Sequence, residues 1–595
     1  MHTFSLHPTW RARAVARWLS LCASVAATAL LASRGHAQEP PAVPAAQAPP
    51  APPVYEPVYH DRAEIGRLFA AWLQRGAERV AWNGAGTSTE GASEPPSALR
   101  FGAPGPIALS ERPTIVLVGA LDGASRSGTE AVLAVCDALL ASRATLPDGL
   151  AFVAIPCAAP DALERTISGA SSAGTSSRPM DDDGDRAVDE DVPDDVDGDG
   201  RILDLLIEDA DGEWTRSSDE RFLARARAGD APRYRWVREG RDDDRDGLFN
   251  EDPVGGVIAD ANFPMHWDGA AKSSGDLPLD DAHARALAEF VTRTHVVAAL
   301  VFQGNHGELA VPGGVSAPLW PEDADAALFE RITALFAQST GRAQPRAVRL
   351  HDAHGGARTG TFVDWAYAAR GAIACEIAAW GPAVERSPDV QGVGLADANL
   401  ATAGGRAPVR PLPPAVDRAW ARWLDNTRGG IGFVDWHPVE LGDGRAGLVG
   451  GWEAYARVHP PPQSLPHALA GLATFVEKLA ANLPALDVEL SLARRDGDVV
   501  TLTAHVTNRG ALPTGSEIPE LVARDPALAK PVELALVLPD GARLLAGERS
   551  VSFERIPGGG RSASCTWVVL AAPGSAFTLR ARAPWTALVS REVKP

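Results

Sequence analysis

The sequence predicts an α/β protein that is followed by a smaller all-β unit. An apolar run at 115–118 leads through a Gly-rich turn into an Ala- and Leu-rich helix that ends near residue 140. This order presents a reactive loop at the carboxyl end of a parallel strand. Two further apolar runs, at 150–156 and 295–302, are typical of buried strands. After residue 486, apolar and polar residues alternate with period two, which indicates a different class of fold.

Length, composition and charge limit the class of protein. A chain of 595 residues is too long for one ordinary domain, and 45% hydrophobic with 22% charged residues is a globular composition. The formal charge is −20, and removing the first 37 residues takes away four arginines and no acidic residue. The remaining chain carries −24, which argues against nucleic acid or an anionic membrane as a partner.

Residues 1–37 have the pattern of a signal peptide. Arg11, Arg13 and Arg17 precede an apolar run at 18–31, and small residues end at Ala37, where we expect cleavage. The apolar run is short for a bilayer span, and no later stretch is long and apolar enough to form one. We therefore expect an exported protein, periplasmic or extracellular, without a membrane span after signal removal. Residues 38–54 read as an extended Pro/Ala linker.

Four cysteines remain after the leader: Cys136, Cys157, Cys375 and Cys565. They are scattered and lack the spacing of metal ligands. Two alternatives stay open for Cys136 and Cys157, which are a disulfide or a pair of buried thiols.

Between residues 55 and 485 we expect one α/β domain, interrupted by an acidic and Gly-rich insertion at 170–255. A first helix is indicated by Ile65, Leu68, Phe69 and Leu73 at helical spacing. Later in the domain we expect a helix at 323–338, a helix at 362–367, a strand at 372–377 and one amphipathic helix at 467–482.

Residues 486–595 are predicted to form a β-sandwich. Segments such as VVTLTAHVTNRG and RSASCTWVVLAA place an apolar residue at every second position, so one face of each strand is buried. Such a module acts as a spacer, as a stabiliser of its neighbour or as a binding unit.

The insertion contains an acidic repeat. DDDGDRAVDED (181–191) aligns without a gap with DDDRDGLFNED (242–252), and a full DxDxDG lies between them at 195–200. Closely spaced carboxylates around a tight Gly turn suit Ca²⁺, although Leu206 replaces the glutamate of a complete EF-hand loop. A solvated acidic loop is the equal alternative. The candidate calcium ligands are Asp181, Asp183, Asp185, Asp195, Asp197, Asp199, Asp242, Asp244 and Asp246.

Several stretches between about residues 55 and 483 resemble the M14 zinc carboxypeptidase family. VLVGALDGASRSGTE (116–130) is similar to the turn that carries the first two zinc ligands, a His and a Glu three residues apart. GVIADANFPMHW (256–267) resembles the substrate segment Asn-Arg-Asn-Phe-Pro, and LVFQGNHGELAVPGG (300–314) the strand that ends in the third ligand. GTFVDWAYAARGAIACEIAAWG (360–381) has the Gly-x-x-x-Asp-Trp-x-Tyr signature and then the strand with the catalytic Glu. The acidic insertion and the GGW at 450–452 resemble a bacterial branch of the family, and the resemblance implies a mixed sheet flanked by helices on both faces.

The resemblance also implies positions for the zinc site, and these carry other residues here. Asp122 and Ser125 stand at the first two ligand positions, and Gln303 stands at the third, with His306 three residues on as an alternative ligand. In the substrate segment Asp260 and Ala261 replace Asn-Arg, which removes the guanidinium that would pair with a C-terminal carboxylate. Glu376 keeps the position of the general base.

A serine hydroxyl and a glutamine carbonyl are weak Zn²⁺ ligands, and one carboxylate does not hold the ion alone. The leading interpretation is therefore a pseudoenzyme that has lost zinc and binds a peptide or glycopeptide. The first alternative is an active hydrolase with a rearranged metal site formed by Asp122, His306 and Glu376, near a further pair, His351 and His354. A second alternative leaves Glu376 as a residual carboxylate in a pocket, or pairs it with a nearby arginine such as Arg358.

Overall fold

The structure is a computed structural model of the chain, and it describes most of the residues after position 53. The described ranges are 54–80, 97–168, 174–181, 186–245, 247–250, 252, 255–313, 324–354, 359–381, 421–426, 429–441, 445–453, 456, 459–518 and 530–594. The predicted signal peptide and linker lie outside these ranges, apart from Val54.

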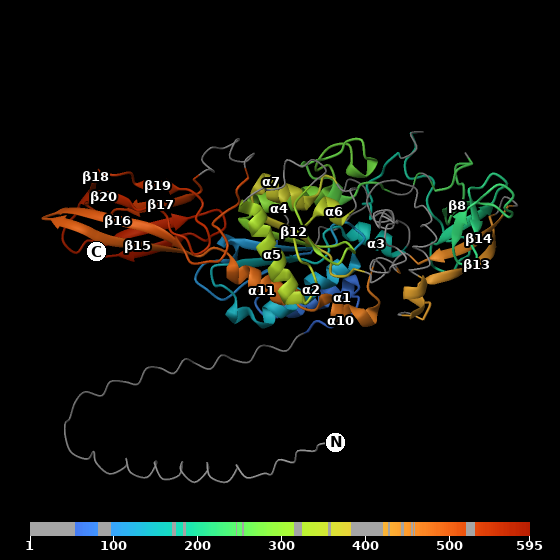
Figure 1. The fold of residues 1–595 in the computed structure, drawn as a ribbon, viewed down its shortest axis with the longest axis horizontal. Helices are drawn as coiled ribbons and strands as arrows, with labels where there is room; N and C mark the ends of the chain where they lie inside the picture. The colour runs from blue at the N-terminus through green and yellow to red at the C-terminus, as the bar shows by residue number, and fades with distance from the viewer. Residues whose placement is uncertain are drawn as a thin grey trace, which may run out of the picture. The chain divides into compact units, whose positions relative to one another are not determined.

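An eight-stranded mixed sheet forms the centre of the α/β region (Figure 1). Its strands, in spatial order, are β1 (Glu78–Arg79), β2 (Leu99–Phe101), β4 (Ala151–Ile155), β3 (Thr114–Gly119), β9 (Val296–Phe302), β12 (Ile373–Ile377), β10 (Leu309–Val311) and β11 (Val348–Arg349). The central strands β4, β3, β9 and β12 are parallel to one another, whereas β1, β2 and β10 each join an antiparallel neighbour. The four parallel strands are buried at every residue, as expected of strands covered on both faces.

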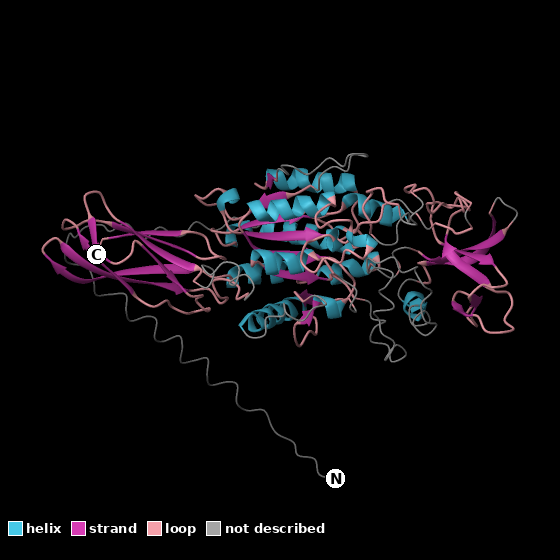
Figure 2. Cartoon of the chain, turned by 90° about the horizontal axis from the view of Figure 1, so that it is seen from above, coloured by secondary structure: helices cyan, strands magenta, loops and turns pink. Residues whose placement is uncertain are grey.

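Helices cover both faces of this sheet. α2 (Arg126–Ala141) packs on β3, and α11 (Leu472–Asn482) packs on α2 and on α5 (Ala324–Thr340). α7 (Phe362–Arg370) packs on β12, and α4 (Ala282–Arg293) packs on α7. Further helices among the described residues include α1 (Arg62–Gln74), α3 (Pro160–Ser168), α6 (Leu350–Ala353) and α10 (Leu465–Leu469). Figure 2 shows the helices running alongside the strands of the sheet.

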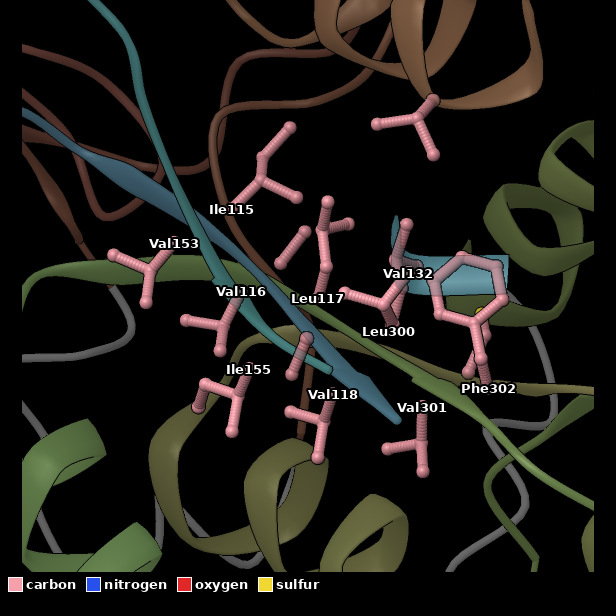
Figure 3. Close-up of a cluster of buried hydrophobic side chains, with 14 of the residues drawn as sticks. Ile115, Val116, Leu117, Val118, Val132, Val153, Ile155, Leu300, Val301 and Phe302 are labelled. Atoms are coloured by element: carbon pink, nitrogen blue, oxygen red, sulfur yellow. The ribbon is translucent and has the colours of Figure 1, made fainter. Parts of the chain in front are cut away.

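The alternation of side chains along each strand supplies the core on both faces. Ile115 and Leu117 project to the face on which Val132 of α2 lies, while Val116 and Val118 project to the opposite face (Figure 3). All five side chains are fully buried. The apolar run in the sequence therefore identifies a strand with two buried faces, because neither face carries polar residues.

The predicted helix at 467–482 is wrong in one respect, since it is two helices. α10 ends at Leu469 and α11 begins at Leu472, with Gly471 between them in the left-handed region at φ +78°. A Cβ at Gly471 would lie 2.1 Å from the carbonyl oxygen of Ser339, at the end of α5. The break thus permits a close approach between two helices that the apolar periodicity alone does not reveal.

A second sheet is assembled from two distant parts of the sequence. Its order is β13 (Phe433–Glu440), β14 (Ala446–Trp452), β5 (Asp204–Glu208), β8 (Tyr234–Arg238), β6 (Trp214–Arg216) and β7 (Leu223–Arg225). The acidic segment therefore contains regular strands, and the GGW motif ends β14, where Gly450 pairs with Asp204. A Cβ at Gly450 would lie 2.9 Å from the Cα of Trp436, which explains the need for glycine.

The C-terminal region contains two four-stranded antiparallel sheets. One has the order β15 (Leu486–Asp496), β16 (Val499–Asn508), β20 (Cys565–Leu570) and β18 (Arg543–Ala546). The other has β19 (Ser550–Phe553), β17 (Val532–Val537), β21 (Phe577–Arg582) and β22 (Val589–Val593). Buried side chains of both sheets form one apolar cluster around Trp567.

The cysteines resolve one alternative left open by the sequence. Cys136, Cys157, Cys375 and Cys565 are all free thiols, so the structure has no Cys136–Cys157 disulfide. Among the helices of the described residues, none is both long and apolar enough to cross a membrane.

The glycine between α10 and α11 gives a test of the fold. We expect Gly471→Ala to lower the free energy of unfolding by more than the about 1–2 kcal/mol that a left-handed conformation costs an L-residue, because the new methyl group meets Ser339. Gly341→Ala is the matched control, since Gly341 has φ +71° and open space around its Cβ position. Denaturant unfolding measures both, and equal losses for the two variants would contradict the close approach.

Candidate functional site

The candidate site lies where three neighbouring parallel strands end. Gly119 of β3 pairs with Phe302 of β9, and Phe302 pairs with Ile377 of β12. The residues that follow β3 and β9, and Glu376 near the end of β12, therefore meet at one edge of the sheet. This is the edge at which α/β folds place ligand sites.

The turn after β3 is closed by its own hydrogen bonds. Asp122 Oδ1 accepts from the backbone N–H groups of Ala124 (3.1 Å) and Ser125 (2.9 Å), and Asp122 Oδ2 accepts from Ser125 Oγ (2.6 Å). Ser125 Oγ also accepts from the N–H of Gly304 at 2.7 Å, which ties the turn to the loop after β9. Both side chains are buried.

Gln303 lies at the centre of the site and is fully buried. Its Oε1 accepts from the N–H of Asp122 at 2.9 Å. Its Nε2 donates to Asp260 Oδ2 at 2.5 Å and to Glu376 Oε2 at 2.7 Å. Because Nε2 faces two carboxylates, the orientation of the amide is determined by its partners.

Two histidines of the site contact Glu376. His306 Nε2 lies 3.0 Å from Glu376 Oε1, and His354 Nε2 lies 2.5 Å from the same oxygen. The two imidazole rings are nearly perpendicular, with centroids 5.2 Å apart. His306 Nδ1 accepts from the N–H of Glu308 at 3.2 Å. His306, His354 and Glu376 are a group whose ligand atoms all lie within 4.8 Å of one another.

The substrate-segment positions join the same network. Asp260 lies in the short 3₁₀ turn Ala259–Ala261 and is buried, and its Oδ1 accepts from the N–H of Phe362 at the start of α7 (2.8 Å). Ala261 follows it and offers no polar side chain. Asp260 therefore acts as a structural link between three segments.

The residues at the implied zinc positions do not fit a zinc ion. The carbonyl oxygen of Gln303 is already bonded to the Asp122 N–H, and Ser125 Oγ is bonded on both its donor and its acceptor side. A cation at this point would have to break these buried hydrogen bonds and leave their partners unsatisfied.

The rearranged set proposed from sequence is only partly assembled. His306 contacts Glu376, but Asp122 is not a member of the three-residue group, and His354 takes the third place. His351, the other residue of the HxxH pair, is not in this group. Arg358, the alternative partner of Glu376, lies outside the described residues.

A second group of ligand atoms occurs in the acidic segment. Asp195, Asp197 and the buried Glu239 lie together. Sequence reasoning missed Glu239 because it stands just before the second half of the repeat, about 40 residues along the chain from Asp195 and Asp197. Asp195 accepts from the N–H groups of Gly198, Asp199 and Gly200, which lower its pKa although burial acts in the opposite direction. Burial raises the pKa of Glu239. A hydrogen bond with the Asp435 carbonyl and the nearby Asp197 carboxylate raise the pKa of His437.

The two halves of the acidic repeat lie beside each other, because Asp191 and Asp252 form an antiparallel bridge. Asp181 accepts from the N–H of Arg186, Asp199 forms a salt bridge with Arg201, and Asp242 lies 3.7 Å from Arg445. Asp244 has an exposed side chain, while Asp183, Asp185 and Asp246 lie outside the described residues.

Comparisons with known proteins identify one sequence family for part of the chain. Residues 487–594 match the model of a domain of unknown function, DUF8731. None of the curated proteins matches the chain.

Solved structures that resemble part of this chain include three with a low identity and a low TM-score. Bovine thrombin-activatable fibrinolysis inhibitor, in complex with a tick carboxypeptidase inhibitor, is 14% identical over 54% of this chain and 86% of its own, with a TM-score of 0.34. Carboxypeptidase A from Helicoverpa armigera is 14% identical over 61% of this chain and 73% of its own, with a TM-score of 0.33. The murein-tripeptide amidase MpaA from Escherichia coli O157 is 16% identical over 58% of this chain and 97% of its own, with a TM-score of 0.23. Matches at these TM-scores carry no weight for function.

The central position of Gln303 gives a direct test of the network. Gln303→Ala removes the donor that Asp260 and Glu376 share, and an unsatisfied buried group costs about 1–3 kcal/mol. We therefore expect the free energy of unfolding to fall by about 2–5 kcal/mol. Gln338→Ala, at an exposed position of α5, is the control and should change little. Chemical denaturation measures both, and a Gln303→Ala protein as stable as the control would contradict the network.

Proposed function

We propose that this chain is an exported, carboxypeptidase-like protein that binds a peptide or glycopeptide and does not perform zinc-dependent trimming at the family's site. Two features support the fold assignment. The family-like motifs occur in the order and spacing described above, and the central sheet is mixed with helices on both faces, as the resemblance implies. Export rests on the pattern of the first 37 residues.

The observation that carries the proposal is the closed hydrogen-bond network at the three implied ligand positions. Asp122, Ser125 and Gln303 use their polar atoms on one another and on Gly304, Asp260 and Glu376. Zinc provides this family's reaction with an activated water near neutral pH. An ion at these positions would break these hydrogen bonds and gain only a serine hydroxyl and an amide carbonyl as weak ligands beside one carboxylate.

The replacement at 260–261 bears on the choice of ligand. A guanidinium recognises a C-terminal carboxylate through two parallel hydrogen bonds, and alanine at 261 has no such group. Asp260 adds a buried carboxylate to the same region. Recognition of a bound peptide therefore depends on groups other than its terminal carboxylate.

Paired peptides test this proposal. Calorimetric titration should give the same affinity, within about twofold, for a peptide with a free C-terminus and for its C-terminal amide, because no arginine is present at 261 to distinguish them. Mass spectrometry of the same mixtures should show no shortened product. Trimming of the free peptide, together with a strong preference for it over the amide, would overturn the proposal.

A hydrolase with a rearranged centre is the second candidate, and the contacts of His306 and His354 with Glu376 favour it. His354, and not Asp122 of the predicted set, lies with His306 and Glu376. In that case Glu376→Gln abolishes turnover, whereas in a binding protein the same substitution changes affinity or stability alone.

We also propose that the DxDxDG loop takes up calcium. The carboxylates of Asp195, Asp197 and Glu239 converge from two segments of the insertion, and oxygen ligands of this kind suit Ca²⁺. Bound calcium would compete with His437, whose Nε2 lies 2.6 Å from Asp197 Oδ2.

Limited proteolysis tests this site. Calcium should slow cleavage within residues 186–252 relative to a chelator, because the ion joins segments that otherwise repel each other. Asp195→Asn should remove the protection, and Asp211→Asn, at an exposed turn of the same insertion, should leave it intact. Identical digestion with calcium and with chelator would contradict the site.

A further inference from the structure

We infer that His306, His354 and Glu376 form a binding site for a divalent transition-metal ion of the Zn²⁺ class, displaced from the three implied zinc positions. The inference does not depend on whether the protein binds or cleaves peptides. It uses two side chains that the family pattern does not employ and one, Glu376, that the pattern assigns to the general base.

The three side chains converge from three separate elements, which are the loop after β9, the residue that follows α6 and strand β12. Both histidines direct Nε2 at one oxygen of Glu376, at 3.0 and 2.5 Å, and their rings are nearly perpendicular. Two imidazoles and a carboxylate whose ligand atoms lie within 4.8 Å of one another are a common three-ligand set for zinc and other divalent transition metals.

The distances within the group are close to those of a metal centre. Ligand atoms about 2.0–2.1 Å from zinc in tetrahedral geometry lie about 3.3 Å from one another. The two distances from His306 Nε2 and His354 Nε2 to Glu376 Oε1 are hydrogen-bond distances, shorter than this by less than 1 Å. An ion would replace both hydrogen bonds, and all three groups would become its ligands, so none of them would be left unsatisfied. Burial of His306 and Glu376 gives the ion a region of low dielectric, where its charge offsets that of the carboxylates.

A glycine lies directly beside the proposed ligand atoms. Gly304 has φ +75°, and a Cβ built there would lie 3.1 Å from Glu376 Oε1 and 3.3 Å from His306 Cδ2. Any other residue would place a side chain against the converging ligand atoms. Glycine therefore leaves this side of the group free of a side chain of its own.

Gln303 orients the Glu376 carboxylate from outside the group. Gln303 Nε2 holds Glu376 Oε2 at 2.7 Å and leaves Oε1 for the histidines. Such outer hydrogen bonds position metal-binding carboxylates and typically change affinity by about 10–100-fold. His306 Nδ1 accepts from the Glu308 N–H, so the ring proton of the metal-free histidine lies on Nε2. This contact would be lost if zinc bound Nε2, so the orienting role belongs to Gln303.

The experiment is a metal titration of the full chain, purified without added metal and stripped with a chelator. Zn²⁺ is added with millimolar Ca²⁺ present, so that the oxygen-rich acidic segment is occupied by the harder ion. We expect about one zinc per chain by elemental analysis after gel filtration. X-ray absorption should show two imidazoles in the zinc coordination shell, and Co²⁺ should give visible bands of a low-coordinate site.

Three variants and a matched control complete the test. His306→Ala and His354→Ala should each weaken zinc binding by at least 100-fold, and Gln303→Ala by about 10–100-fold. His351→Ala removes the neighbouring histidine of the same HxxH pair and should bind zinc as the unmodified chain does. Circular dichroism checks that each variant is folded, and His354→Gln replaces any alanine variant that is not.

The outcomes separate clearly. Loss of zinc in both histidine variants with retention in His351→Ala supports the site. An unmodified chain that takes up no stoichiometric zinc, a coordination shell without imidazole, or zinc retained by both histidine variants would each overturn it. None of these outcomes involves a peptide, so a failure here is distinct from a failure of the proposed function.

Discussion

The hydrogen bonds of one buried amide hold the candidate site together. Gln303 joins the turn after β3, the 3₁₀ turn at Ala259–Ala261 and strand β12 through a bond to the Asp122 N–H and bonds to two carboxylates. A carboxylate or an imidazole at this position would not reproduce the pattern, because only a side-chain amide offers one acceptor and two donors. Because of this amide, the residues at the implied zinc-ligand positions form a closed hydrogen-bond network.

The central strands can be predicted from the sequence because the pattern that identifies each strand lies within the strand itself. Strands β3, β4 and β9 are continuous apolar runs, and the structure buries them on both faces as such runs predict. The break at Gly471 was missed, because its cause is the approach of Ser339, more than 130 residues away in the sequence. The six-stranded sheet was missed for the same reason, since it pairs β5 with β14 across the α/β region.

The candidate site can be predicted only in part, because contacts between separate segments decide the rest. Motif spacing placed Asp122, Ser125, Gln303 and Glu376, and the structure brings these residues to one edge of the sheet. Spacing did not reveal that Asp260 is a bonding partner or that His354 reaches Glu376, because side-chain contacts depend on the registers of separate elements. The HxxH at 351–354 was the available signal, but only the fold distinguishes His354 from His351.

An anomalous difference map at the zinc absorption edge, from crystals of protein purified without added metal, tests the central claim most directly. We expect no peak among Asp122, Ser125 and Gln303, and density that places the Gln303 amide between Asp260 and Glu376. A strong peak about 2.0–2.2 Å from Asp122 and the Gln303 carbonyl oxygen would contradict it.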